Sequence, residues 1–301
     1  MPSQNPSFLL KLVSLFSVVR GYNILVIILA QYLASIFIIA PDHLGGKEIL
    51  FNQNLFLIVL ASSLSIASGY IINNFYDSEK DLINRPNKTY IDNYVSQKTK
   101  LATYFVLNFI CVIIASYVAF QAVVFFSAYI FAIWLYSHKL KKIPILGNIS
   151  AATLAVIPFF VVFVYFRNFD LVIFVHAMFL FLVLVIRELV KDLENLRGDF
   201  AQDYPTLPVT YGEQTAKLAI SVLVFLTFVP VVILLQKFEI GYMDFYFVFT
   251  TILLVLFLYF LWISKSKSQY LWLHNLLKFI IVFGVLCILL IDVDVVIKKL
   301  I

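Results

Sequence analysis

The chain has little charge and few of the residues that crosslink a protein or bind zinc. Asp, Glu, Lys and Arg make up 13% of its 301 residues, whereas 62% are hydrophobic. Its two cysteines, Cys111 and Cys287, lie inside apolar segments, where cysteine behaves as a small hydrophobic residue. The four histidines are scattered without ligand spacing. We therefore expect neither a disulfide framework nor a zinc site.

The sequence also lacks a Gly/Ser-rich linker, a low-complexity block and the apolar–polar alternation typical of a membrane β-barrel. Its apolar runs, such as residues 219–236, "AISVLVFLTFVPVVILLQ", are apolar on every side and long enough to cross ~30 Å of hydrocarbon. No small-residue cleavage site precedes the first run, so we expect it to be retained as a span. These features predict an all-α, polytopic membrane protein with one domain over residues 1–301.

We predict nine membrane-spanning helices. Their approximate bounds are 20–40, 53–73, 101–119, 121–137, 149–166, 170–190, 216–236, 243–263 and 273–293. The third and fourth spans are the least clearly separated, because Gln121 is the only polar mark between them and one long helix is the alternative. This count puts most of the 22 lysines and arginines in loops on one side of the membrane.

The positive-inside rule then predicts that the N-terminus and these basic loops are cytoplasmic. If the chain is bacterial, its membrane is the inner membrane. Topology accounts for the formal net charge of +5, so we expect the partner surface to be the lipid bilayer and not nucleic acid.

Two acidic stretches follow predicted spans on the same side. In the first, residues 73–88, "NNFYDSEKDLINRPNK", side chains with oxygen ligands occupy positions i, i+1, i+4 and i+8: Asn73, Asn74, Asp77 and Asp81. Residues four apart share a helix face, so three of these side chains project together.

The second stretch, residues 186–200, reads "IRELVKDLENLRGDF". Its oxygen ligands recur at intervals of four, three and four: Glu188, Asp192, Asn195 and Asp199. Glu194 lies off this stripe. Carboxylates crowded at a membrane face repel one another and resist desolvation, so we expect a cation among them. Hard oxygen ligands suit Mg²⁺, which completes its shell with water and phosphate oxygens.

Basic side chains occur near both acidic stretches, as a bound diphosphate requires. They are Arg20, Lys139, Lys141, Lys142, Arg187 and Lys191. Their alternative role is membrane topology alone. Tyr136, at the end of a span, is a candidate contact to diphosphate or acceptor, although tyrosines at this position are more often interface anchors.

At these residues the sequence resembles the UbiA superfamily of intramembrane prenyltransferases. Its first motif, N-D-x-x-D-x-x-x-D followed by N-R-P, is matched by "NNFYDSEKDLINRP", in which Asn74 stands where the family has Asp. In the second motif, Asn195 stands where an acid is common. "VRGYN", with Arg20 and Asn23, resembles the family's Arg-Pro-x-Asn, with Gly21 in place of proline. "YSHKLKKIPILGN" and "TLPVTYG" resemble two further family segments.

The resemblance implies nine helices in a ring around a central, lipid-accessible cavity, and Mg²⁺-dependent transfer of a polyprenyl group from a prenyl diphosphate. It implies one Mg²⁺ on Asn73, Asp77 and Asp81 and another on Asp192, Asp199 and Glu188, with Asn195 as a further ligand. Lys141, Lys142, Arg187 and Lys191 then assist the leaving diphosphate, and Arg20, Asn23, Asn74 and Tyr136 are expected to contact substrate. Asp77, Asp81, Asp192 and Lys141 are the expected catalytic residues.

The segment "RELVKDLENLRGD" is most similar to the branch that transfers a geranylgeranyl group to geranylgeranylglyceryl phosphate. An aromatic acceptor, such as 4-hydroxybenzoate in quinone biosynthesis, is the alternative within the superfamily. A cation-coupled transporter also places acids at membrane helix ends. A catalytically silent relative is the third alternative, which the two Asn replacements would favour if they abolished metal binding.

Overall fold

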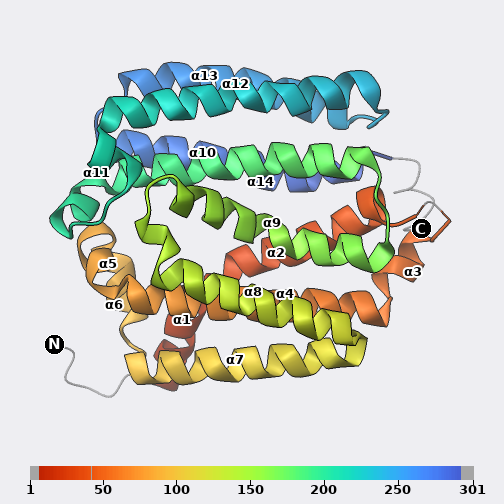
Figure 1. Cartoon of the computed structure of the whole chain (residues 1–301), viewed down its shortest axis with the longest axis horizontal. Helices are drawn as coiled ribbons and strands as arrows, with labels where there is room; N and C mark the ends of the chain where they lie inside the picture. Colours follow the sequence, from red (N-terminus) through yellow and green to blue (C-terminus); the bar gives the residue numbers. More distant parts are fainter. Residues whose placement is uncertain (1–6, 42, 293–301) are drawn as a thin grey trace. The chain divides into compact units, whose positions relative to one another are not determined.

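The computed structural model describes residues 7–41 and 43–292, and every regular element in these residues is helical. The elements are α1 (Phe8–Val18), α2 (Gly21–Ala34), η1 (Ser35–Ile39), α3 (Gly46–Leu50), α4 (Gln53–Tyr76), α5 (Ser78–Asn84), α6 (Pro86–Asp92), α7 (Gln97–Val118), α8 (Phe120–His138), η2 (Leu140–Lys142), α9 (Leu146–Phe166), α10 (Leu171–Ala201), α11 (Leu207–Tyr211), α12 (Glu213–Lys237), α13 (Met243–Ile263), α14 (Lys267–Cys287) and η3 (Ile288–Leu290). The predicted all-α class is confirmed (Figure 1).

Nine helical segments within the described residues are long and apolar enough to cross a membrane, as the sequence predicts. The third and fourth spans are separate helices. Ala119 has an extended backbone, with φ −173° and ψ 160°, and ends α7 before α8 begins. The sixth span is longer than expected. It continues as one helix, α10, to Ala201, so the second acidic stretch belongs to the span itself.

The chain divides into two compact units, which we describe separately. The first comprises residues 1–28 and 57–140, and the second comprises residues 29–56 and 141–301. Helices α2 and α4 each contribute residues to both units. The single domain predicted from the sequence stays a prediction.

In the first unit, α7 packs against α8, and α1 packs against α6. Helix α4 carries four buried serines, Ser62, Ser63, Ser65 and Ser68. The hydroxyls of the last three donate to carbonyl oxygens three or four residues earlier in α4. This local bonding lets a polar residue lie in a membrane helix without an unsatisfied hydroxyl, and the small side chains permit close helix packing.

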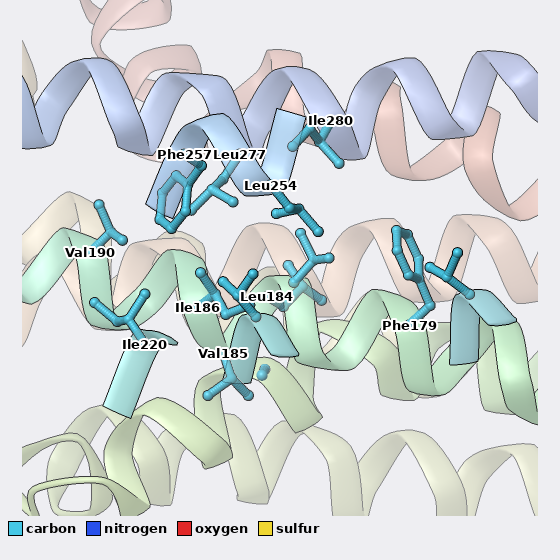
Figure 2. Close-up of a cluster of buried hydrophobic side chains, with 14 of the residues drawn as sticks. Phe179, Leu184, Val185, Ile186, Val190, Ile220, Leu254, Phe257, Leu277 and Ile280 are labelled. Atoms are coloured by element: carbon cyan, nitrogen blue, oxygen red, sulfur yellow. The ribbon is translucent and has the colours of Figure 1, made fainter. Parts of the chain in front are cut away.

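In the second unit, α10 packs against α9, α12 and α14, and α12 and α14 also contact α13. Side chains of α10, α13 and α14 gather in the core that Figure 2 shows. Val183, Leu254 and Leu277 are fully buried there. The apolar part of α10 is therefore fixed on three sides, which holds the polar end of the same helix in place.

Polar groups of the second unit also find partners inside it. Pro158 lies inside α9, and its carbonyl oxygen accepts a 2.8 Å hydrogen bond from Gln31 Nε2. The buried Lys217 ammonium lies 2.9 Å from Glu213 Oε1 and donates to the Ser264 carbonyl at 2.7 Å. The Tyr270 hydroxyl donates to Glu213 as well. A buried lysine thus keeps a counter-charge.

Gly284 of α14 lies where this helix packs closely against Tyr246 of α13. A Cβ atom at this position would lie 2.5 Å from the Tyr246 hydroxyl oxygen, which donates to the Ile280 carbonyl at 3.1 Å. We expect Gly284→Val to destabilise the protein by about 1–3 kcal/mol, because overpacking forces the helices or Tyr246 to move. Thermal unfolding in detergent measures this, with Gly45→Ala as the control, since open space surrounds Gly45. Equal melting temperatures for the two variants would contradict the packing.

Candidate functional site

The first acidic stretch lies at the junction of α4 and α5 in the first unit. Asp77 separates the two helices, with φ −94° and ψ 5°, yet the hydrogen-bond ladder continues through it. Asp77 N donates to Asn73 O at 3.0 Å, and Asp81 N donates to Asp77 O at 2.8 Å. The predicted four-residue spacing of Asn73, Asp77 and Asp81 is therefore present in the backbone, and all three side chains are partly exposed.

Asn74, one residue further along α4, is buried in a polar network. Its Nδ2 donates to Asp92 Oδ2 at 3.1 Å, and its Oδ1 accepts from Lys100 Nζ at 2.9 Å. Both ends of the amide are thus bonded to protein groups of the first unit. Sequence reasoning did not single out Asp92 or Lys100.

Arg20 and Asn23 meet at a residue that the sequence did not reveal, Tyr70 of α4. The Arg20 guanidinium lies 5.1 Å from the centre of the Tyr70 ring, and Asn23 Nδ2 donates to the Tyr70 hydroxyl at 3.2 Å. Tyr70 precedes Asn73 and Asn74 by about one helical turn, and this spacing is the signal that could have found it.

Gly21 also has a local explanation. A Cβ atom there would lie 2.0 Å from Cε2 of Phe16, so the aromatic ring occupies the space that a proline would need. Glycine, and not the proline of Arg-Pro-x-Asn, therefore fits where Phe16 of α1 packs onto the start of α2.

In the second unit, Glu188 binds the two cations beside it. Glu188 Oε1 lies 2.6 Å from Arg187 Nη2, and Oε2 lies 2.7 Å from Lys191 Nζ. Glu188 is buried, with 7% of its surface exposed, so each of its carboxylate oxygens is used in a charge-assisted hydrogen bond. The group orders Arg187 and Lys191, whose side chains remain partly exposed.

Asp192 is oriented by a residue of another helix. Asn148, in the first turn of α9, donates from Nδ2 to Asp192 Oδ2 at 2.7 Å. Asn148 was missed, although it ends the segment "YSHKLKKIPILGN". Ile145 precedes α9 with a φ of 66°, a costly conformation for a β-branched residue.

Three further side chains of α10 that carry oxygen atoms, Glu194, Asn195 and Asp199, are buried as well. Asn195 is 6% exposed, and within the described chain its Oδ1 is buried without a hydrogen-bond partner. Asp199 is 1% exposed. Glu194, which lies off the stripe, is bonded through Oε2 to His274 Nδ1 of α14 at 2.6 Å, and both side chains are buried. The stripe and the structural pair thus occupy different faces of α10.

The other predicted contacts differ in exposure. Lys141 is buried in η2, whereas Lys142 next to it is exposed, and Tyr136 is partly buried in the last turn of α8. Asp77 and Asp81 belong to the first unit, and Asp192 and Asp199 belong to the second. In the part of the chain that the structure describes, no three His, Cys, Asp or Glu side chains form a group that could hold a metal ion. A metal here needs the Asn oxygens, water or substrate as additional ligands.

The described residues hold nine candidate spans, two of which have acidic ends, and the chain is an integral, multi-pass membrane protein. The chain belongs to the UbiA prenyltransferase family, whose model matches residues 28–280.

Two curated relatives show the range of similarity. The digeranylgeranylglyceryl phosphate synthase of Thermococcus sibiricus is 34% identical over 165 residues, which cover 54% of this chain and 59% of the relative. The synthase of the same name from Methanobrevibacter smithii is 26% identical over 255 residues, covering 80% of this chain and 84% of the relative. The match thus spans about three fifths of the Thermococcus protein and most of the Methanobrevibacter protein.

Solved structures show the same fold. A digeranylgeranylglyceryl phosphate synthase structure has a TM-score of 0.68 at 21% identity, covering 92% of this chain and 97% of the other. A UbiA homologue from Archaeoglobus fulgidus bound to GPP and Mg²⁺ has a TM-score of 0.66 at 14% identity, covering 91% of this chain and 99% of the other.

Two substitutions of Tyr70 distinguish the contribution of its hydroxyl group from that of its ring. Tyr70→Phe removes the Asn23 hydrogen bond and should cost about 0.5–1.5 kcal/mol of stability. Tyr70→Leu also removes the cation–π contact of Arg20, so we expect a further loss of about 0.5–2 kcal/mol. Thermal unfolding measures both, with Tyr117→Phe and Tyr117→Leu as controls, because Tyr117 is 75% exposed. If the Tyr70 pair behaved like the Tyr117 pair, Tyr70 would not join Arg20 to Asn23.

Proposed function

We propose that this protein transfers a geranylgeranyl group from geranylgeranyl diphosphate to geranylgeranylglyceryl phosphate, forming an ether lipid with the help of Mg²⁺. Membership of the UbiA prenyltransferase family and the name shared by the curated relatives support this proposal. The observation that carries it is the preserved spacing of Asn73, Asp77 and Asp81 on one hydrogen-bond ladder. Such oxygen-rich ligands are suited to Mg²⁺ and phosphate.

The residues present fit a Mg²⁺-diphosphate site in their donor chemistry. We assign Asn73, Asp77 and Asp81 to one metal ion and Asp192, Asn195 and Asp199 to another. The buried, unpartnered Oδ1 of Asn195 supports this assignment, because a cation would supply its missing partner. We propose that Glu188 mainly holds Arg187 and Lys191 ready for phosphate oxygens, since both of its own oxygens are already engaged. Its role as a metal ligand stays a prediction.

In the proposed reaction, the allylic C–O bond of the donor breaks and its electron pair leaves with the diphosphate. The acceptor hydroxyl oxygen then forms the new ether bond to the allylic carbon and releases its proton. Bound Mg²⁺ supplies Lewis-acid stabilisation of the leaving group. Lys141, Lys142, Arg187 and Lys191 add positive charge where the diphosphate becomes more negative. Arg20, Asn23 and Tyr136 are proposed substrate contacts.

The aromatic content of the chain suits an allylic cation. Aromatic residues make up 17% of the chain, and ring faces stabilise a nearby cation without reacting as water would. We propose that the prenyl chain lies among the apolar membrane helices and that the N-terminus and the basic loops are cytoplasmic. Membership of the prenyltransferase family and the cations Arg187 and Lys191, which are suited to phosphate, favour the prenyltransferase over a cation-coupled transporter.

The central test is an assay of purified protein with labelled geranylgeranyl diphosphate and Mg²⁺. Geranylgeranylglyceryl phosphate and 4-hydroxybenzoate are supplied separately as acceptors. We expect a labelled ether lipid with the first acceptor only. We also expect a loss of at least about 10²-fold in rate for Asp77→Ala and Asp192→Ala, because each removes a carboxylate assigned to the Mg²⁺ that stabilises the leaving group. Asp244→Ala is the matched control, since Asp244 is an exposed acid in the first turn of α13.

Labelled hydroxybenzoate in this assay would assign the protein to the quinone pathway. Absence of transfer to both acceptors, together with absence of Mg²⁺-dependent donor binding, would refute the prenyltransferase proposal.

Asn148 offers a second test, of how Asp192 is held. Removing the amide in Asn148→Ala frees the Asp192 carboxylate, and we expect apparent Mg²⁺ affinity to fall about 10-fold or more, as for other groups that orient metal ligands. The measurement is the Mg²⁺ dependence of the transfer rate. Asn168→Ala is the control, because the Asn168 side chain bonds only to a neighbouring backbone amide. An unchanged Mg²⁺ dependence would show that Asn148 does not prepare Asp192 for metal.

A further inference from the structure

The acid-bearing segment that follows α4 is closed on itself by a side-chain bond. Asn74 lies in the last turn of α4, and Asp92 is the last residue of α6. Asn74 Nδ2 donates to Asp92 Oδ2 at 3.1 Å across a separation of 18 residues. Asp77, Asp81 and all of α5 lie between these two residues. The bond therefore joins the two ends of the segment that carries the first acidic stretch.

Asp92 is the centre of this closure. It is 1% exposed, and its Oδ1 accepts from Ser17 Oγ at 2.6 Å. Its Oδ2 accepts from Lys88 Nζ at 2.5 Å in addition to Asn74, and its backbone carbonyl accepts from Ser14 Oγ at 3.1 Å. One buried residue thus connects α1, α4 and α6.

Lys100, in the first turn of α7, determines which way the Asn74 amide faces. It is also 1% exposed, and its Nζ donates to Asn74 Oδ1 at 2.9 Å. An ammonium group can only donate and a carboxylate can only accept, so the amide oxygen must face Lys100 and the amide nitrogen must face Asp92. Each polar group of Asn74 thereby has a partner of the right kind.

We propose that Asn74, Asp92 and Lys100 form a clasp that positions Asp77 and Asp81, and that Asn74 binds neither metal nor substrate. This inference rests on the proposed function. A ladder of backbone hydrogen bonds runs through the closed segment, in which each amide donates to the carbonyl four residues earlier. Its amides are those of Asp77, Asp81, Arg85 and Thr89, and its first carbonyl is that of Asn73. A ladder fixed at both ends restricts the motion of the acids it carries, and such preorganisation raises their affinity for a cation.

The clasp also accounts for the residue type at position 74. An aspartate there would place a second carboxylate oxygen about 3.1 Å from Asp92 Oδ2, where the amide now donates. Like charges at this distance repel one another. Asn74 is therefore the partner that Asp92 requires, and the departure from N-D-x-x-D follows from the burial of Asp92.

Asn74→Asp separates this proposal from the alternative that position 74 contributes a metal ligand. An added carboxylate ligand would raise the affinity for Mg²⁺, whereas a broken clasp lowers it. We expect Asn74→Asp and Asp92→Asn each to weaken Mg²⁺-dependent binding of geranylgeranyl diphosphate by about 10-fold, a typical effect for groups that orient metal ligands. The exchange variant, Asn74→Asp with Asp92→Asn, restores one amide opposite one carboxylate and should recover most of the loss.

Binding is measured by titrating Mg²⁺ into the full-length protein with geranylgeranyl diphosphate, following tryptophan fluorescence, and thermal unfolding is recorded beside it. Tighter binding by Asn74→Asp, unchanged binding in the single variants, or an exchange variant with the summed defects of the two would each overturn the clasp.

Lys100→Met provides a comparison with a second buried lysine. We expect it to lower both the melting temperature and the Mg²⁺-dependent binding, and Lys100→Arg to retain part of both. Lys217→Met, which removes a buried lysine of the second unit, should lower the melting temperature alone. Equal effects of the two Met variants on Mg²⁺-dependent binding would reduce Lys100 to a general stabilising role and overturn the clasp.

Asp77→Ala in the same titration distinguishes the two proposals. If Asp77→Ala abolishes Mg²⁺-dependent binding while the clasp variants leave it intact, the clasp fails and the proposed function stands. If wild type and Asp77→Ala both lack such binding, the proposed function fails.

Discussion

The structure depends on one constraint, which is that a polar group inside a membrane helix must have a partner. In hydrocarbon no water is present to satisfy it, so an unpaired donor or acceptor costs several kcal/mol. The serines of α4 meet this constraint within their own helix. Gln31 meets it through the Pro158 carbonyl, and Lys217 through Glu213 and the Ser264 carbonyl. The bonds from Gln31 to Pro158 and from Lys217 to Ser264 join different parts of the second unit, so they fix the arrangement of its helices more specifically than apolar packing alone.

The same constraint gives the two acidic stretches different local environments. Asp77 and Asp81 remain partly exposed, while Asn74 and Asp92, which flank them in the sequence, form a buried polar network. On α10, by contrast, Glu188 is paired with cations of its own helix, and Asp192 is held by Asn148 of α9. Each stretch is thus ordered by its own unit, through partners of different chemistry.

Apolar periodicity and residue spacing were sufficient to predict much of the fold. Nine spans, the break near Gln121 and the common spacing of Asn73, Asp77 and Asp81 all follow from local pattern, because helix geometry repeats every few residues. The partners of the site residues did not follow. Tyr70, Asn148 and Lys100 meet their partners across 47, 44 and 26 positions of the chain, and no periodicity relates such distant residues. The role that we propose for Asn74 likewise depends on its bond to Asp92, 18 positions away, which local pattern does not predict.

The continuity of helix α10 limits the insertions that the protein tolerates. Its 31 residues run without interruption from the apolar core to the acidic stripe, so core and stripe share one rotational register. One inserted residue between Val183 and Glu188 would turn the whole stripe by about 100° about the helix axis. Such an insertion would leave every acid in the sequence and carry the stripe away from Asn148. Loops between spans impose no such coupling, so variation in length is expected to concentrate there and to spare the middle of α10.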